Sequence, residues 1–298
     1  MSDSPSKSDG PLIKPLHHEP HGALKVRFWG VRGSIPSPGP DTARYGGNTS
    51  CVEVSGGGTL VALDGGTGLR RLGGELMATA KASEVHLFLS HLHWDHIQGI
   101  PFFTPAFVPG NKVHFYGERK GELGLRSILE AQMTSPNFPV PLSIMRSEMS
   151  FTELEPQSQL KMGALEARTT PLNHPNGCLG IRLSYQGRSV VYTTDTEHDP
   201  SGALDERLVA LARGADALIY DAMYTDEEYQ TRVGWGHSTY SEALRVAREA
   251  GVKALYFFHH DPEHDDDFLD QQLALWLPEA ERLGLKLEMA REGHSFYL

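Results

Sequence analysis

The stretch HLHWDH at residues 91–96 places three histidines and one aspartate within six positions. Buried histidine and aspartate side chains are costly unless a partner satisfies them, so a cluster that follows an apolar segment requires such a partner. Imidazole nitrogens and carboxylate oxygens bind zinc, iron or manganese. His91 and His93, two positions apart in an extended stretch, project to the same side. Asp95 and His96 follow a turn and point elsewhere, so the spacing predicts two adjacent metal ions.

Three further segments place a polar residue immediately after an apolar strand. They contain His174, Asp195 and, in the sequence FFHHDP, either His259 or His260. Strand ends from distant parts of a chain meet where strands lie side by side in one sheet, so these residues are expected to join the 91–96 cluster in one site. A carboxylate has the two oxygens needed to bridge metal ions about 3.5–4 Å apart, and Asp195 is the expected bridge.

The elements that must position these residues are read from the apolar pattern, which predicts strands with helices between them. The expected strands cover residues 23–30, 50–55, 59–66, 84–90, 112–117, 164–172, 178–185, 188–195, 215–222 and 252–258. The expected helices cover residues 68–80, 121–133, 203–213, 239–251 and 266–283, and two short strands follow. Runs of Val, Leu, Ile and Phe fit sheets covered by helices on their outer faces. The sequence predicts one α/β domain over residues 23–298, behind a disordered tail over residues 1–22.

Composition excludes several functional classes. The 298-residue chain carries a formal charge of −11, which argues against a surface built for long duplex nucleic acid. No apolar run approaches the length that spans a bilayer, and residues 1–22 lack the apolar stretch of a signal peptide. We therefore expect a cytoplasmic protein with no membrane partner. Cys51 and Cys178 are the two cysteines, and we expect both to be buried free thiols.

With these residues assembled, the chain resembles the metallo-β-lactamase-fold hydrolases over roughly residues 24–298. The family's HxHxDH motif stands here as HLHWDH, and an upstream LDGGTG at residues 63–68 contains Asp64. The resemblance implies a four-layer αβ/βα sandwich with a dinuclear centre at one edge, between the two sheets. It implies two divalent metal ions, with zinc expected and manganese or iron as alternatives. The first ion is assigned to His91, His93 and His174, and the second to Asp95, His96 and a late histidine, with Asp195 bridging both.

Later motifs resemble the phosphodiesterase branch, which includes ribonuclease Z and cyclic-nucleotide phosphodiesterases. These motifs are GHSTYSEAL at residues 236–244 and YFFHHDP at residues 256–262. Alignment through the proline of the second motif makes His259 the metal ligand and His260 its neighbour. The first motif makes His237 the residue that protonates the leaving group, which suits an imidazole that titrates near neutral pH. The alternative is that Ser238 and Thr239 cap a helix, with His237 merely exposed.

Other polar residues carry less specific signals. The opening segment, which resembles the same branch, contains Arg32, Ser34, Asn48 and Thr49. These four either donate hydrogen bonds to a phosphate or brace the loop beneath the metals, and the sequence does not separate the two roles. Asp64 and Asp221 are expected to accept hydrogen bonds from ligand histidines and to fix their tautomers. His198, Asp199 and the acidic run 265–267 are interpreted as solvated surface.

Three departures from related families limit the function. Only 20 residues separate His174 from Asp195, which leaves no room for the long basic arm with which ribonuclease Z grips tRNA. A tRNA partner is therefore not expected. Asp195 stands where the commonest zinc β-lactamases carry cysteine, and His93 stands where flavodiiron-type oxidoreductases carry glutamate. Neither antibiotic hydrolysis nor that redox chemistry is expected.

The sequence thus predicts a dinuclear-metal-dependent phosphodiesterase for a small-molecule diester such as a cyclic nucleotide. A metal-bridging hydroxide would attack phosphorus, Asp95 would orient or deprotonate the nucleophile, and His237 would protonate the leaving group. Two alternatives stay open. One is a thioester or lactone hydrolase of the glyoxalase-like type, and the other is a ligand sensor without turnover. Homodimers are common among such hydrolases, so a homodimer is one expected assembly.

Overall fold

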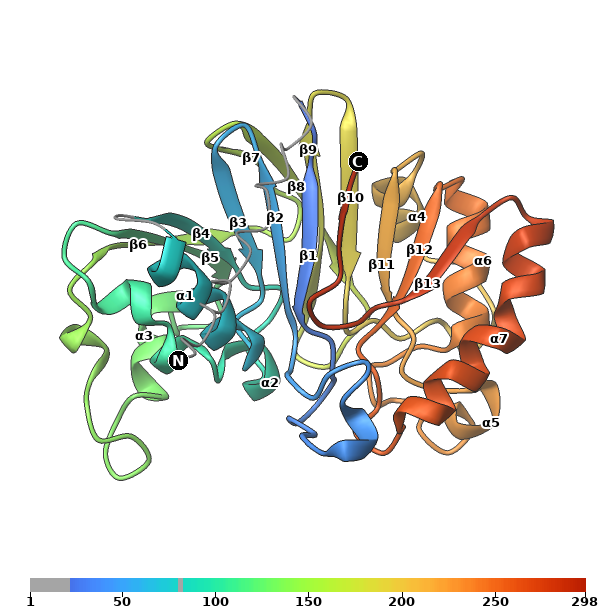
Figure 1. The fold of residues 1–298 in the computed structure, drawn as a ribbon, viewed down its shortest axis with the longest axis horizontal. Helices are drawn as coiled ribbons and strands as arrows, with labels where there is room; N and C mark the ends of the chain where they lie inside the picture. The colour runs from blue at the N-terminus through green and yellow to red at the C-terminus, as the bar shows by residue number, and fades with distance from the viewer. Residues whose placement is uncertain (1–21, 80–82) are drawn as a thin grey trace, which may run out of the picture.

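The computed structural model describes residues 22–79 and 83–298, which form two sheets with helices beside them (Figure 1). The tail expected over residues 1–22 falls almost entirely outside the described residues. Within the described part of the chain, no helix has the length and apolar character needed to cross a membrane.

Each sheet has seven strands. The first has the order β14 (Ser295–Tyr297), β1 (Lys25–Gly30), β2 (Cys51–Gly56), β3 (Thr59–Leu63), β4 (Glu84–Phe88), β5 (Lys112–Glu118) and β6 (Glu148–Leu154). The second has the order β13 (Lys286–Met289), β12 (Ala254–Phe258), β11 (Ala217–Asp221), β10 (Arg188–Thr193), β9 (Cys178–Tyr185), β8 (Leu165–Leu172) and β7 (Gln159–Met162). Pairing is parallel from β3 to β6 and from β10 to β13, and antiparallel elsewhere.

The helices lie on the outer faces of the two sheets (Figure 1). Beside the first sheet are α1 (Gly68–Thr79) and α3 (Leu125–Ala131), and beside the second are α4 (Glu206–Ala212), α6 (Tyr240–Ala250) and α7 (Asp266–Arg282). Two short helices, α2 (Trp94–Ile97) and α5 (Asp226–Tyr229), lie at the lower end of the molecule in this view. Single 3₁₀ turns cover Pro40–Thr42, Ile100–Phe102, Thr104–Phe107 and Leu142–Ile144.

The central core is built by both sheets. Phe28 of β1, Tyr192 of β10 and Phe258 of β12 are fully buried in one hydrophobic cluster. The ring centroids of Phe28 and Phe258 are 6.1 Å apart, so the two inner faces pack directly on each other. Helix, sheet, sheet and helix form four layers, and the predicted αβ/βα sandwich is confirmed.

Burial explains which strands the sequence predicts. Strands β11 and β12 are buried at every position and read as continuous apolar runs, as expected for parallel strands covered on both faces. Strands β6 and β7 are absent from the predicted set, although they complete the two sheets. Both are edge strands whose residues are mostly exposed or half-buried, so they lack the apolar run by which the others are found.

Helix α6 is held at both ends by the residues that sequence rules favour. The Thr239 hydroxyl accepts a hydrogen bond from the Glu242 backbone N–H at 3.2 Å and caps the first turn. Gly251 ends the helix with φ 63°, a left-handed conformation that favours glycine. The cap lies two residues after His237, so the start of α6 also fixes where the loop bearing His237 meets the second sheet.

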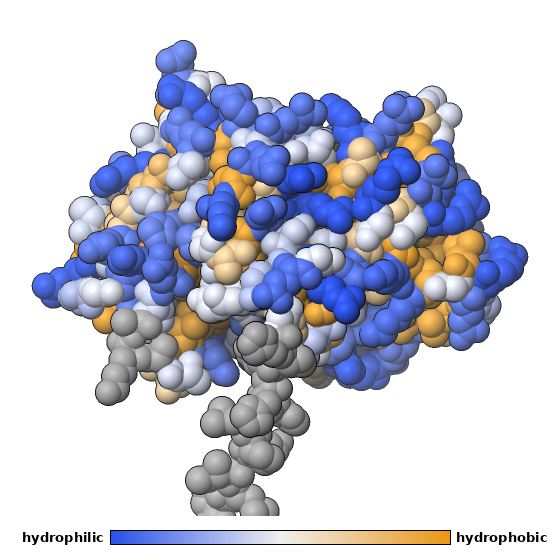
Figure 2. Space-filling view, turned by 90° about the horizontal axis from the view of Figure 1, so that it is seen from above, coloured by the Kyte–Doolittle hydropathy of each residue, from blue (hydrophilic) through white to orange (hydrophobic). Residues whose placement is uncertain are grey.

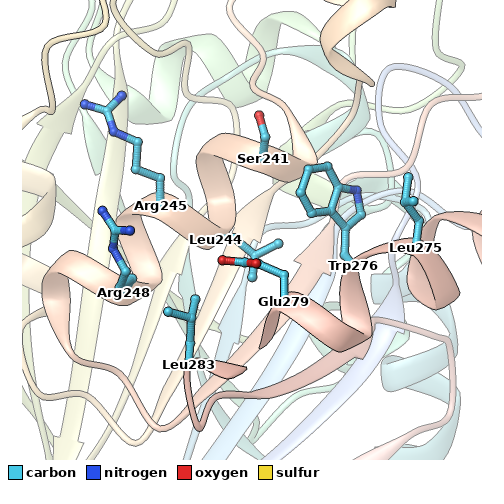
Figure 3. A pocket seen from close by; sticks show the side chains of 8 residues that line it. All are labelled: Ser241, Leu244, Arg245, Arg248, Leu275, Trp276, Glu279 and Leu283. Carbon is cyan, nitrogen blue, oxygen red and sulfur yellow. The ribbon is translucent and has the colours of Figure 1, made fainter. Parts of the chain in front are cut away.

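The surface above the sheets differs from the outer helical face. Viewed from above, hydrophilic residues predominate, and hydrophobic residues lie between them without forming one continuous patch (Figure 2). On the outer side, α6 and α7 form a groove of about 410 Å³, lined by Leu244, Leu275 and Trp276 among others (Figure 3). None of the predicted site residues lines this groove.

Cys51 and Cys178 are buried and unpaired, as predicted.

Candidate metal centre

The predicted ligands come together from segments far apart in the sequence, at the end of the sheets where α2 lies. His91 and His93 follow β4, Asp95 and His96 lie in α2, His174 follows β8, Asp195 follows β10, and His259 follows β12. Strand β4 belongs to the first sheet, and β8, β10 and β12 belong to the second, so loops from both sheets converge at this edge.

Three of the residues at this edge have left-handed backbone conformations. Asp64, Asp195 and His259 have φ values of 64°, 47° and 62°. Each follows closely on the end of a strand, so the chain turns sharply as it leaves the sheet. Such conformations are uncommon for residues other than glycine, and they cluster at active sites and ligand-binding sites.

The first ligand group consists of His91, His93, His174 and Asp195, whose ligand atoms all lie within 4.8 Å of one another. His93 Nδ1 lies 3.1 Å from His174 Nε2. Asp195 Oδ2 lies 3.5 Å from His91 Nε2 and 3.8 Å from His174 Nε2. Three imidazoles and one carboxylate oxygen therefore face a common centre.

The second group consists of Asp95, His96, Asp195 and His259, all buried. His96 Nε2 lies 3.0 Å from Asp95 Oδ2 and 3.2 Å from Asp195 Oδ1. His259 Nε2 lies 3.3 Å and 3.2 Å from the same two oxygens. Asp195 thus turns Oδ2 to the first group and Oδ1 to the second, which is the arrangement required of a bridging carboxylate.

The donor atoms fit a pair of divalent cations. Ligands about 2.0–2.1 Å from one tetrahedral zinc ion lie about 3.4 Å from each other, close to the separations found here. His174 Nδ1 faces the Gly236 carbonyl at 2.8 Å, so that nitrogen carries the proton and Nε2 offers its lone pair. His91 Nε2 is buried without a hydrogen-bond partner. A lone pair left facing other lone pairs in the interior is satisfied when a metal ion binds.

The electrostatic surroundings of the ligand groups also favour bound cations. Burial lowers the pKa of His91, His93 and His174, which keeps these imidazoles in the neutral form that binds metals. Burial also lowers the pKa of His96, but the neighbouring carboxylates outweigh it and raise that pKa well above its usual value. In the described part of the chain, the cationic partners of Asp95 and Asp195 are all histidines. Bound cations would balance this buried negative charge.

Asp64 orients the second ligand group through a contact with His96. Its carboxylate accepts hydrogen bonds from the Ser90 backbone N–H at 2.7 Å, the Ser90 hydroxyl at 2.8 Å and the Tyr192 hydroxyl at 2.7 Å. It also lies 2.8 Å from His96 Nδ1, so His96 presents Nε2 to the cluster. This is the orienting role that the sequence predicts for Asp64.

Replacing Asp64 with alanine is expected to lower the free energy of unfolding by about 3–5 kcal/mol, because several buried donors lose their acceptor. Urea denaturation of metal-free protein measures the change. The Asp64→Asn variant keeps the side-chain volume and one oxygen, and a smaller loss is expected. An alanine variant as stable as the wild type would contradict the anchoring role.

His237 lies beside both groups and is held by Asp221. Its Nδ1 is 2.9 Å from Asp221 Oδ2, and Asp221 also accepts the backbone N–H groups of Thr196 and Met223 at 3.2 Å. Burial lowers the pKa of His237, but the Asp221 carboxylate and its neighbours outweigh burial and raise it to about 9. His237 is 8% exposed, so the alternative of a merely exposed histidine is wrong. The helix cap at Thr239 and this buried histidine coexist.

The two late histidines have different surroundings. His259 faces the second ligand group, whereas His260 Nε2 lies 2.8 Å from the Ala290 carbonyl, away from both groups. Burial lowers the pKa of His260 to about 3, so it is neutral in its pocket. The structure therefore places the first histidine of the pair, His259, in the cluster.

Most of the opening-segment residues brace the loop. The Arg32 side chain is fully buried and donates to the carbonyls of Gly46, Asp261 and His264. The Asn48 amide donates to Glu292 at 2.9 Å. A cavity of about 490 Å³ lies beside the cluster, and neither the Arg32 nor the Asn48 side chain lines it. Thr49 Oγ1 accepts the Thr67 backbone N–H. Ser34 differs, because it lines that cavity and its backbone N–H donates to Asp95 Oδ2 at 2.8 Å.

Two expectations of solvated surface are corrected. Asp266 is buried, because its carboxylate accepts the backbone N–H groups of Arg44 and Tyr45 at 2.7 and 3.2 Å. His198 is half-buried, with Nδ1 3.0 Å from the Ser238 hydroxyl. Both partners lie far away in the sequence, so the local run of polar residues gives no sign of them.

Glu197 is a supporting residue absent from the predicted site. Its carboxylate is buried and accepts the backbone N–H groups of Gly234 at 2.7 Å and Gly236 at 2.8 Å. The Gly236 carbonyl in turn orients His174, and a Cβ at Gly236 would overlap the His174 ring. Glu197 therefore positions a predicted ligand through one glycine. Its place two residues after Asp195 is the only sequence signal, and it is a weak one.

This sandwich, with paired histidine and aspartate groups at one edge, is that of a metal-dependent hydrolase of the metallo-β-lactamase fold. The sequence profile of the beta-lactamase superfamily domain matches residues 62–260, so the chain belongs to that family. Ribonuclease Z from Brevibacillus brevis is 26% identical over 254 residues, which cover 70% of this chain and 78% of that protein.

Two solved structures show the same fold. The metallo-beta-lactamase fold protein YhfI from Bacillus subtilis aligns with a TM-score of 0.68 and 21% identity, covering 93% of this chain and 100% of the other. A diphosphatase from the PhnP family aligns with a TM-score of 0.65 and 19% identity, covering 93% and 97%. These two structures share the fold of this chain, and the ribonuclease Z relative is similar to it in sequence.

Proposed function

We propose that this protein is a metal-dependent phosphodiesterase that cleaves a small phosphodiester, with a cyclic nucleotide among the candidate substrates. The observation that carries the proposal is the His237–Asp221 pair beside the paired ligand groups. An alkoxide leaving group needs a proton, and this pair supplies one at the cluster. When bound, the two divalent ions would supply an activated water and neutralise charge on the phosphate oxygens.

Groups of the protein itself would donate the proton and orient the attacking water. The Asp221 carboxylate fixes Nδ1 of His237, which leaves Nε2 to donate its proton to the departing oxygen. The backbone N–H of Ser34 holds Asp95 Oδ2 at 2.8 Å, so one oxygen of that carboxylate has a fixed orientation at the cavity. Asp95 is therefore suited to orient the attacking water and accept its proton.

The substrate is proposed to be small, although the curated relative from Brevibacillus brevis is named ribonuclease Z. Strands β9 and β10 lie between His174 and Asp195 and are joined by residues 186–187 alone, which leaves no RNA-binding arm in this segment. The formal charge of −11 disfavours a long polyanion. A compact diester at the cluster requires neither an arm nor a basic surface.

The experiment compares bond types on one preparation. Protein loaded with Zn²⁺ or Mn²⁺ is given bis(p-nitrophenyl) phosphate, an S-acyl thioester and a lactone. We expect hydrolysis of the diester, abolished by EDTA, and slower turnover of both acyl substrates. Faster acyl hydrolysis would favour the glyoxalase-like alternative. A cyclic nucleotide that binds the metal-loaded protein and is recovered unchanged, with the diester also intact, would favour a sensor.

A further inference from the structure

Two cavities meet at the predicted metal centre. One, of about 490 Å³, is lined by Ser34, Leu92, His93, Trp94, Asp95, Asp195 and His237. The other, of about 580 Å³, is lined by His91, Leu92, His93, Asn176, Gly177 and residues of the 118–128 segment. We call them the Trp94 cavity and the Leu123 cavity. They share Leu92 and His93, so a ligand at the cluster has space on two sides.

The Trp94 cavity contains the proton donor. His237 lines this cavity and does not line the other. Because the leaving oxygen must lie within reach of His237, the leaving group occupies the Trp94 cavity. The Trp94 side chain is 80% exposed beside Asp95, although indole is a costly group to leave in water. Its ring offers a flat face against which a leaving group can pack.

The Leu123 cavity offers an apolar wall. Leu123 is 58% exposed and Ile128 is half-buried, and both line the cavity together with Leu92. Exposed apolar side chains that line a cavity beside a reactive centre are typical of ligand contacts. The cavity volume is within the usual range for small-ligand sites.

The cations of this wall are already engaged. Lys120 Nζ donates to Glu118 at 2.7 Å and to the Asn176 carbonyl at 2.8 Å. Arg119 donates to the carbonyls of Gly121 and Glu122 within its own turn. These contacts fasten the 118–123 turn to the loop after His174 and satisfy the cations internally. The wall therefore has little capacity to bind a second phosphate.

We propose that the Leu123 cavity binds the substituent that stays on phosphorus, and that this substituent is a neutral organic group that packs against the apolar wall. The substrate is then a linear diester with separate groups in the two cavities, which narrows the candidates of the proposed function and disfavours a cyclic nucleotide. Water adds to phosphorus, the bond to the leaving oxygen breaks, and His237 gives that oxygen its proton. A proton released by the water restores His237, and the monoester leaves with the retained group. This inference rests on the proposed phosphodiesterase function.

Two esters with one leaving group test the assignment. Thymidine 5′-(p-nitrophenyl phosphate) has a large retained group, and methyl p-nitrophenyl phosphate has a minimal one. We expect Leu123→Ser to raise the KM for the thymidine ester about tenfold and to change the KM for the methyl ester much less. Trp94→Ala should raise the KM for both esters, because their leaving group is the same. Leu123 and Trp94 are exposed, so neither substitution disturbs the core.

Leu275→Ser is the matched control. Leu275 is 65% exposed on α7, in the groove of Figure 3. Its substitution should leave the KM for both esters unchanged. The inference is overturned if Leu123→Ser affects both esters equally, or if the wild type cleaves a 3′,5′-cyclic nucleotide faster than the thymidine ester. Absence of turnover with both linear esters, in protein carrying metal, would instead reject the phosphodiesterase function.

Discussion

The Asp195→Ala variant is expected to lose bound metal and to hydrolyse bis(p-nitrophenyl) phosphate about 10³-fold more slowly than the wild type. Asp195 is the one residue that belongs to both ligand groups, with Oδ2 facing His91 and Oδ1 facing His259. Removing it takes one ligand from each group at once. It also leaves the surrounding buried histidines without the carboxylate that draws them together.

Metal analysis and steady-state kinetics on the same preparation measure both effects. Asp199→Ala is the matched control, because Asp199 is an exposed aspartate four residues away and belongs to neither ligand group. The control should keep the wild-type metal content and rate. An Asp195→Ala protein that retains two metal ions and full activity would show that the carboxylate does not bridge them.

The His237→Ala variant is expected to lower kcat about 10²–10⁴-fold for diesters with alkoxide leaving groups. The reason is that His237 lines the cavity and has Nε2 free to donate a proton, while Asp221 holds Nδ1 at 2.9 Å. p-Nitrophenolate departs without a proton, so the loss should be less than about tenfold with p-nitrophenyl esters. His237 lies outside the two ligand groups that Asp195 joins. It is within ligand distance of Asp221 and His259, but Asp221 holds its Nδ1, so the metal content should not change.

The comparison requires a linear alkyl diester, such as a dinucleoside monophosphate, beside a p-nitrophenyl ester. His114→Ala is the control, because His114 lies on β5 and contacts Ser150 and Glu84. Equal loss with both leaving groups would contradict proton donation and would indicate that His237 acts by holding Asp195 or the metals. Loss of metal from the variant would point the same way.

The sequence predicts the buried strands of the fold better than the edge strands β6 and β7. Fully buried strands such as β11 and β12 are visible as apolar runs because both faces are covered. The edge strands β6 and β7 have one unpaired side and many exposed residues, so their pattern does not differ from that of loops. Their place in the sheets depends on pairing with β5 and β8, which is a tertiary effect.

In the candidate site, too, the sequence predicts the residues that a local pattern constrains and misses those that depend on distant partners. Residues 91–96 are close in sequence and constrained by metal geometry, so their types and spacing suffice to predict a metal cluster. Glu197 and Asp266 act through backbone N–H groups of distant loops, and no local pattern reveals those partners. The walls of the Leu123 cavity are likewise assembled from segments around Lys120 and Asn176 that meet only in the folded chain.

Stepwise reconstitution tests the central claim most directly. Metal is removed with EDTA, Zn²⁺ is returned in known equivalents, and bis(p-nitrophenyl) phosphate hydrolysis is followed with bound metal measured at each step. We predict no turnover by the metal-free protein, and full activity once both ligand groups are filled by two ions per chain. Undiminished hydrolysis by metal-free protein, or two bound ions with no diester hydrolysis, would contradict a paired metal centre built for phosphodiesters.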